Sequence, residues 1–179
     1  MSTIKVKEKQ FAISIPEAEI LTAVQRVADA INHDLEGKEP LFLSVLNGAF
    51  MFTADLMKRI TIPCEVSFIK LSSYEGTSST GQVRQLMGLN QCIKGRTVVI
   101  VEDIVDTGLT MQKLLELLQA QEPAEVHIAT LLLKPDKLKV PLHIEYAAMQ
   151  IPNDFIVGYG LDYDGFGRNY KDIYTVVSD

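Results

Sequence analysis

Residues 98–111, with the sequence VVIVEDIVDTGLTM, decide the fold class of this chain. The stretch begins with an unalternating run of β-branched residues, which is typical of a strand buried on both faces of a parallel sheet. From Gly108 onward, apolar residues recur at helical spacing, and they predict a helix that extends to about Gln121. A buried strand that leads directly into a helix indicates an α/β protein.

The same succession of strands and helices continues on both sides of this stretch. The apolar patterns predict a helix over residues 16–31, a strand over 41–46, a helix over 50–57, and strands over 65–71 and 126–133. This order predicts a mostly parallel central sheet flanked by helices. Ligands of such folds bind beyond the carboxyl ends of the strands, where the chain places Asn47, Gly48, Glu102, Asp103 and Lys134.

Residues 72–82 form a contrasting segment, because they are rich in serine, threonine and glycine and offer little to bury. Loops of this length inside compact proteins are often lids over a site. Residues 83–89 are predicted to be a strand, so the loop would connect the two strands of a β-hairpin. The alternative interpretation is a flexible linker, although loop tips seldom need a tyrosine such as Tyr74.

Three carboxylates, Glu102, Asp103 and Asp106, lie within five residues of one another. They repel one another unless a cation or hydroxyl donors offset their charge, and a hard cation such as Mg²⁺ prefers carboxylates together with substrate oxygens. The next turn offers backbone N–H groups, two threonine hydroxyls and a glycine at the start of a helix, which is an anion site. A sugar phosphate with free hydroxyls fits both halves of this segment.

At this point the sequence resembles a known family. Residues 98–110 resemble the PRPP-binding signature of type I phosphoribosyltransferases, and four further segments resemble hypoxanthine-guanine phosphoribosyltransferases in the family's own order. These are residues 45–50, 71–74, 132–134 and 155–163, the last followed by Arg168. The resemblance runs from about residue 11 to residue 177. It implies the type I phosphoribosyltransferase fold, with a small hood that binds the base and a mobile lid loop.

The resemblance also implies roles for the PRPP-binding residues. Glu102 and Asp103 would hold the ribose hydroxyls and the Mg²⁺ sphere, and Asp162 would join a second Mg²⁺ through its water shell. Asp106 would act as general base or acid beside the purine N7. The 5′-phosphate would be wrapped by Asp106, Thr107, Gly108, Leu109 and Thr110.

The remaining matched residues would serve the leaving group, the lid and the base. The pyrophosphate would contact Leu46, Asn47, Gly48 and Arg168, and the lid would begin at Ser73 and Tyr74. Lys134 would donate to the purine O6 and so select 6-oxopurines over adenine. Phe155 would stack on the base, and the backbone of Ile156 would read the edge of its ring.

The pyrophosphate loop contains one departure from the family pattern. The family often carries a basic residue after the leucine of this loop, and this chain has Asn47. If the loop binds through main-chain groups, little is lost; if the side-chain charge contributes, the affinity for PRPP is lower. The family's loop also has a non-proline cis peptide, so a cis Leu46–Asn47 bond is a hypothesis despite its intrinsic cost.

Each of these residues also has a plainer interpretation. Glu102 and Asp103 alone would be a solvated strand end, Lys134 an ordinary strand-end charge, and Phe155 a core residue. Asp162 and Arg168 could form a surface pair. The triplet that begins at Asp106 also occurs in aspartic proteases, but those need a second triplet or a symmetric dimer and an all-β pattern. The register with the family motifs favours the functional interpretations.

Composition limits the remaining possibilities. The chain has 179 residues, 47% of them apolar and 22% charged, which suits one domain over residues 1–179. The net charge of -6 argues against nucleic-acid binding. Neither a signal peptide nor a membrane-spanning run is present, so a soluble cytoplasmic protein is expected. Cys64 and Cys92 are expected to fill the core in a reducing compartment, and the three histidines receive no role.

The sequence therefore predicts a purine salvage enzyme that transfers the phosphoribosyl group of PRPP to hypoxanthine or guanine. The alternative is a PRPP-sensing regulator of the same fold, which would need a basic surface or an added DNA-binding domain. Xanthine stays open as the base, since it differs from hypoxanthine and guanine only at C2. A homodimer or homotetramer is expected by analogy with the family.

Overall fold

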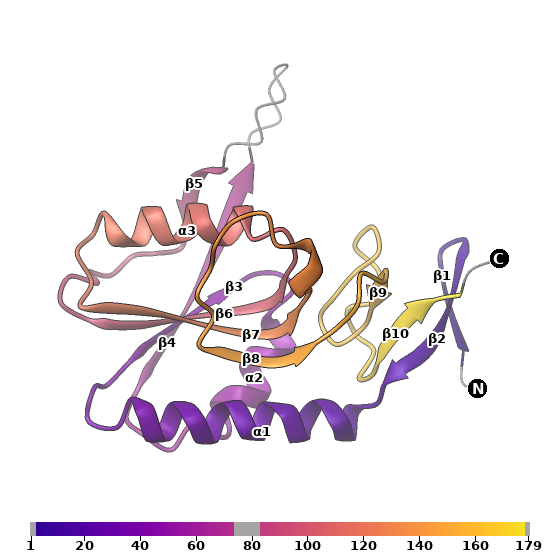
Figure 1. Ribbon diagram of the computed structural model, residues 1–179, viewed down its shortest axis with the longest axis horizontal. Helices are drawn as coiled ribbons and strands as arrows, with labels where there is room; N and C mark the ends of the chain where they lie inside the picture. The colour runs from indigo at the N-terminus through magenta and orange to yellow at the C-terminus, as the bar shows by residue number, and fades with distance from the viewer. Residues whose placement is uncertain (1–2, 74–82, 178–179) are drawn as a thin grey trace.

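The computed structural model describes residues 3–73 and 83–177 of the chain, so Tyr74 and the rest of the predicted lid lie outside the described residues. Two sheets organise the described part (Figure 1). The larger has six strands in the order β5-β4-β3-β6-β7-β8, and the smaller has four in the order β1-β2-β10-β9.

The six-stranded sheet is mostly parallel, as predicted. Its parallel strands are β3 (Leu41–Val45), β4 (Glu65–Ser73), β6 (Thr97–Val105), β7 (Glu125–Leu133) and β8 (Tyr146–Gln150). The edge strand β5 (Val83–Met87) pairs antiparallel with β4, in agreement with the predicted hairpin. All five residues of β3 and the first five of β6 are buried, which explains their unalternating apolar sequences.

Helices cover both faces of this sheet (Figure 1). Helices α1 (Glu17–Asp34) and α2 (Phe50–Met57) lie against one face, and α3 (Leu109–Gln119) lies against the other. Each face buries its own apolar cluster, which is the expected layering of an α/β protein. Among the described residues, no helix combines the length and the apolar character needed to cross a bilayer.

Strand β6 is longer than the sequence predicted. The pattern suggested that the strand ends at Val101, with the carboxylates beyond it, but β6 continues to Val105. The reason is its neighbour: β6 pairs in register with β7 from Thr97 opposite Glu125 to Val105 opposite Leu133. Glu102 and Asp103 are therefore held by a sheet ladder rather than by a loop.

The smaller sheet, here called the hood, joins the two ends of the chain. It consists of β1 (Thr3–Val6), β2 (Lys9–Ile15), β10 (Ile173–Val176) and β9 (Ile156–Val157). All its pairings are antiparallel, and its own apolar cluster forms around Phe11, Val157 and Tyr174. The hood lies beside the carboxyl-end edge of the large sheet, to the right in Figure 1.

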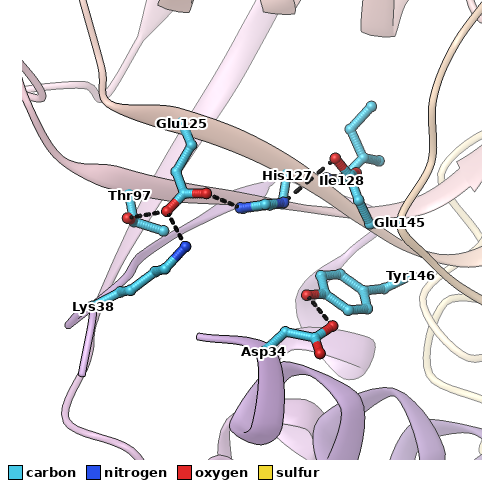
Figure 2. A network of polar contacts seen from close by, with 8 residues as sticks. All are labelled: Asp34, Lys38, Thr97, Glu125, His127, Ile128, Glu145 and Tyr146. Atoms are coloured by element: carbon cyan, nitrogen blue, oxygen red, sulfur yellow. Dashed lines mark hydrogen bonds and ion pairs between the residues drawn. The ribbon is translucent and has the colours of Figure 1, made fainter. Parts of the chain in front are cut away.

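A polar network closes the opposite, amino-terminal edge of the large sheet (Figure 2). Glu125 accepts a hydrogen bond from Lys38 at 2.6 Å and another from Thr97 at 3.0 Å, and its second oxygen lies 2.9 Å from Nε2 of His127. Nδ1 of His127 lies 3.4 Å from a carboxylate oxygen of Glu145. His127, which received no role from the sequence, thus lies between two carboxylates.

The two cysteines occupy different environments. Cys64 is half-buried and packs against the core, and burial raises the pKa of its thiol. Cys92 is exposed in the connection between β5 and β6, so the expectation that it fills the core was wrong. The residue beside it, Ile93, takes the buried position instead.

Candidate active site

The functional segments predicted from the sequence meet at the carboxyl-end edge of the large sheet. Strand β3 leads into the loop that begins at Leu46, and β6 leads into the turn that begins at Asp106. Strand β7 ends beside them, because the backbone N–H of Lys134 donates to the carbonyl of Val105 at 3.0 Å. Parallel pairing of β3, β6 and β7 therefore brings three distant stretches of sequence together.

Glu102 and Asp103 form the carboxylate corner of this edge. The backbone N–H of Asp103 donates to Oε1 of Glu102 at 3.0 Å, and Asp103 accepts from the N–H of Ile104 at 2.8 Å. Glu102 keeps some surface accessibility, yet burial of its carboxyl group raises the pKa of Glu102 well above its usual value, and the charge of Asp103 adds to the effect. A bound cation would oppose both effects, so this corner suits a metal such as Mg²⁺.

The described residues supply such a cation with few ligands of their own. In that part of the chain, no group of three or more histidine, cysteine, aspartate or glutamate side chains converges on one point. The three residues predicted as metal ligands do not form one cluster, since Asp162 is engaged elsewhere. Substrate oxygens and water would have to complete the coordination, as is usual for Mg²⁺.

The phosphate turn, residues 106–110, connects β6 to α3. Gly108 adopts a left-handed conformation with φ of 82°, and a Cβ at this position would lie 2.8 Å from Cδ1 of Leu142. Glycine is therefore required both for the backbone and for the packing. A cavity of about 90 Å³ is lined by β6, this turn and the start of α3, where unpaired helical N–H groups attract an anion.

The pyrophosphate loop, Leu46, Asn47 and Gly48, lies directly against the carboxylate corner. Its Leu46–Asn47 peptide bond is cis, as hypothesised. A Cβ added to Gly48 would lie 1.8 Å from Oδ2 of Asp103, so a side chain at this position would displace the carboxylate. A Cβ added to Gly160 would in turn lie 2.1 Å from the carbonyl oxygen of Gly48. The loop is thus enclosed between β6 and the segment that follows β9.

Arg168 and Asp162 do form an ion pair, with Nη2 and Oδ1 3.0 Å apart. The arginine has a second contact, because its Nη1 donates to the carbonyl of Gly160 at 2.7 Å. The other carboxylate oxygen of Asp162 accepts from the N–H of Gly165 at 2.7 Å. Because Gly160 also lies against Gly48, this pair is connected to the pyrophosphate loop. The ion pair of the plainer interpretation therefore exists, and it lies beside the candidate site.

Lys134 and Asp106 lie at the end of the site that faces the hood. Lys134 is buried, and its ammonium donates to the carbonyl of Asp154 at 2.8 Å. It lies 4.0 Å from Oδ2 of Asp106. A second cation is closer: Nζ of Lys137 is 3.1 Å from Oδ1 of Asp106. Sequence reasoning missed Lys137, although a proline right after Lys134 signalled a turn that brings the chain back.

Phe155 and Ile156 differ in burial although they are neighbours. Phe155 is 43% exposed, which contradicts a plain core role, and its ring meets that of Tyr163 edge-on at a centroid distance of 5.4 Å. Ile156 is buried in β9, opposite Thr175 of β10. The hood therefore holds one aromatic ring open to solvent beside a fixed strand. Of the two lid residues, Ser73 ends β4 and Tyr74 is outside the described residues.

Comparison with known proteins places these features in a family. A family model described as the phosphoribosyl transferase domain matches residues 16–164. The hypoxanthine-guanine phosphoribosyltransferase of Lactococcus lactis is 40% identical over 162 residues, which cover 90% of this chain and 86% of that protein. The hypoxanthine phosphoribosyltransferase of Salmonella typhimurium is 41% identical over 154 residues, covering 84% of this chain and 86% of its own length.

Solved structures agree with the sequence relatives. The crystal structure of a hypoxanthine-guanine phosphoribosyltransferase from Bacillus anthracis matches with a TM-score of 0.86 and 39% identity, covering 93% of this chain and 98% of that one. The Trypanosoma cruzi hypoxanthine phosphoribosyltransferase matches with a TM-score of 0.87 and 38% identity, covering 97% and 95%. Because the family model and these relatives span most of its length, this chain belongs to the phosphoribosyltransferase family.

Proposed function

We propose that this chain is a purine salvage enzyme that transfers the 5-phosphoribosyl group of PRPP to hypoxanthine or guanine, giving IMP or GMP and pyrophosphate. All of residues 1–179 would serve this one activity. The observation that carries the proposal is the close approach of Gly48 to Asp103. It sets a pyrophosphate loop, a carboxylate corner and a phosphate turn side by side, in the order in which PRPP carries pyrophosphate, ribose hydroxyls and 5′-phosphate.

The reaction requires control of charge at the ribose. Breaking the bond from C1 to pyrophosphate develops an oxocarbenium-like centre and a highly anionic leaving group. Glu102 and Asp103 would hold the ribose hydroxyls and the Mg²⁺ sphere, and the bound cation supplies offsetting charge for the leaving group. Arg168 would contact the pyrophosphate, and the N–H groups of the phosphate turn would fix the opposite end of PRPP. Asp162 would reach a second Mg²⁺ through water.

Base selection would depend on the end of the site that faces the hood. The ammonium of Lys134 has three N–H donors, so it can keep its bond to Asp154 and still donate to a purine O6. Adenine offers no acceptor at that position. The exposed ring of Phe155 would stack on the base, with the backbone of Ile156 at the ring edge. Asp106 would exchange a proton with N7, since it lies within reach of the same lysine.

Two further features complete the proposal. A lid that begins at Ser73 and Tyr74 would exclude water, which competes with the purine as acceptor. A homodimer or homotetramer is the assembly that we expect by analogy with the family. The loop that carries Asn47 would bind pyrophosphate through its main chain, because Gly48 has no side chain between the loop and Asp103.

The test is nucleotide formation from PRPP and Mg²⁺, with hypoxanthine, guanine, xanthine and adenine offered separately. We expect product from hypoxanthine or guanine and none from adenine. Product from adenine would contradict the role of Lys134. Binding of PRPP without product from any base would contradict the enzyme and favour a PRPP-sensing regulator. Omission of Mg²⁺ should abolish product, which checks the proposed cation.

A further inference from the structure

Lys137 contacts the carboxylate to which the proposed function assigns proton exchange. Its Nζ lies 3.1 Å from Oδ1 and 3.3 Å from Oδ2 of Asp106, so the ammonium spans both oxygens. We propose that Lys137 is a positioning residue that holds the carboxylate of Asp106 oriented toward the bound base. This inference rests on the proposed function, because it concerns how the acid–base residue of that reaction is held ready.

The placement of Lys137 is fixed by the segment that carries it. Pro135–Lys137 forms a short 3₁₀ turn directly after β7, and the N–H of Lys137 donates to the carbonyl of Lys134 at 3.1 Å. The N–H of Lys139 then donates to the carbonyl of Thr107 at 2.9 Å. This hydrogen bond ties the turn that carries Lys137 to the phosphate turn that carries Asp106.

Side chains of the same segment pack behind the phosphate turn. A Cβ at Gly108 would lie within 3.2 Å of side-chain atoms of Leu138, Val140 and Leu142. The segment therefore packs directly against the turn. Lys137 and Asp106 extend from these two packed segments. The positions of the two backbones therefore bring their side chains together.

Lys137 is the cation best placed to act on Asp106. Lys134 is farther away, at 4.0 Å, and its ammonium is engaged by the carbonyl of Asp154. On the β6 side, Glu102 lines the same cavity and Asp103 follows it in the chain, so the charged groups on that side are acidic. Without Lys137, the remaining cation near Asp106 among the described residues would be Lys134, at 4.0 Å.

The physical consequence is a change in turnover rather than in binding. Two contacts to one ammonium fix the direction of the Asp106 carboxylate, and a general base must lie within hydrogen-bond reach of the proton that it accepts. Removing the ammonium should therefore lower kcat while the KM for PRPP changes little. The side chains of Asp106 and Lys137 are 39% and 35% exposed, so solvent screens the pair and the loss should be modest, about tenfold.

The experiment compares Lys137→Met, Lys137→Arg and the matched control Lys139→Met. Lys139 lies on the same segment, but its side chain is exposed and its tie to Thr107 is through the backbone. The measured quantities are kcat and the KM values for hypoxanthine and PRPP, at saturating Mg²⁺. We expect kcat of Lys137→Met to fall by about tenfold, with both KM values within about twofold of the wild type. Lys137→Arg should restore kcat, and Lys139→Met should match the wild type.

Three outcomes would overturn the inference. A rise in either KM with an unchanged kcat would mean a role in binding, and unchanged kinetics would mean no role. A higher kcat after removal of the ammonium would mean that the contact restrains Asp106. Thermal unfolding checks that the variants are folded, and Asp106→Asn separates the inference from its premise. If Asp106→Asn lowers kcat while Lys137→Met does not, the inference alone fails; if Asp106→Asn leaves kcat near normal, the proposed role of Asp106 fails with it.

Discussion

The phosphate turn and the hood contribute to one site, but the chain builds them in opposite ways. Strand β6, the turn and helix α3 are contiguous, from Thr97 to Gln119, so one stretch of sequence specifies both the structure and the charged groups. The hood joins residues 3–15 to residues 156–176, and the buried ring of Phe11 lies 5.9 Å from the exposed ring of Phe155, which is distant in the sequence. The charged groups of β6 and the phosphate turn therefore come from one short stretch of sequence, whereas the hood depends on contacts between residues far apart in the chain.

The two halves meet at a backbone contact. Gly160 follows the hood strand β9, and it approaches the carbonyl of Gly48 so closely that no side chain fits between them. Gly48 in turn approaches the side-chain carboxylate of Asp103 of β6, so that a Cβ on Gly48 would lie 1.8 Å from Oδ2 of Asp103. From this comparison we predict that substitutions in β6 and the phosphate turn, here called the phosphate half, change turnover. Substitutions in the hood should change binding of the base, and substitutions at the joint, where Gly160 meets Gly48, should change binding of PRPP.

The largest effect is expected from Asp106→Asn. The substitution keeps the size of the side chain but removes a carboxylate that would exchange a proton with N7, so turnover should fall by about 10²–10⁴-fold. Binding of PRPP, measured by calorimetry, should be largely unchanged because the N–H groups of the turn remain. Near-normal turnover would remove Asp106 from the acid–base role, and the phosphate half would then serve binding alone.

The joint between the halves should be the next most sensitive place. An alanine at Gly160 would have φ near 97° and its Cβ 2.1 Å from the carbonyl oxygen of Gly48. The pyrophosphate loop would have to move, and we expect the KM for PRPP to rise by about tenfold. Gly165→Ala is the matched control, since Gly165 also has a positive φ of 84° but its added Cβ meets nothing within 4 Å. Equal effects in both variants would mean that backbone strain, and not the contact with the loop, causes the change.

The sequence predicted the phosphate half closely and the hood poorly, for a physical reason. The buried strand, the left-handed Gly108 and the following helix are all local signals. The hood strands β1, β9 and β10 have only four, two and four residues, too few for a periodic pattern, and the pairing of β10 with β2 joins the two ends of the chain. The hood was expected from the family resemblance, not from these residues.

The same reasoning explains the smaller errors. Strand β6 extends to Val105 because β7 pairs with it, and a single sequence does not reveal where a partner strand ends. Lys137 was missed because its partner, Asp106, is 31 residues away. Glu102 and Asp103, by contrast, belong to a segment in which neighbouring residues alone suggest the chemistry, so no distant contact was needed to propose them.

A smaller effect is expected where the N-terminal hairpin holds the loop that follows β9, beside the proposed base-binding residue Phe155. Lys7 forms an ion pair with Asp164 at 2.9 Å, and the hydroxyl of Tyr163 donates to Glu8. This hydrogen bond is the main reason that the pKa of Tyr163 is raised to about 12. Because the ring of Tyr163 meets Phe155 edge-on, Tyr163→Phe should loosen the stacking residue and raise the KM for hypoxanthine by about threefold.

The control for this variant is Tyr170→Phe. Tyr170 packs against the apolar cluster of the hood and meets Tyr174 at a ring distance of 5.6 Å, but it is not in contact with Phe155 among the described aromatic pairs. We expect both variants to keep the wild-type KM for PRPP. A change in PRPP binding after Tyr163→Phe, or the same loss of hypoxanthine binding in both variants, would contradict a specific link from the hairpin to the base.

The smallest effect on activity, and a distinct effect on stability, is expected at the amino-terminal edge of the sheet. The ammonium of Lys38, with Thr97 and His127, lowers the pKa of Glu125 from its usual 4.5 to about 2 (Figure 2). A carboxylate whose pKa is lowered by folding stabilises the fold above its unfolded pKa, and this contribution is lost as the pH falls from about 4.5 to about 2. The urea midpoint of the wild type should therefore drop over this window, and Glu125→Gln should show a shallower drop.

This edge separates stability from function, because Glu125 begins β7 and the proposed site lies at the other end of the same strand. Activity of Glu125→Gln at pH 7 should equal that of the wild type. The control is Glu122→Gln, whose ion pair with Lys94 is about 70% exposed on both sides, so solvent screens it more strongly. If both glutamine variants flatten the acid profile equally, general charge repulsion explains the pH dependence. If only Glu125→Gln does, the network around Glu125 is a specific contribution to the fold that leaves catalysis untouched.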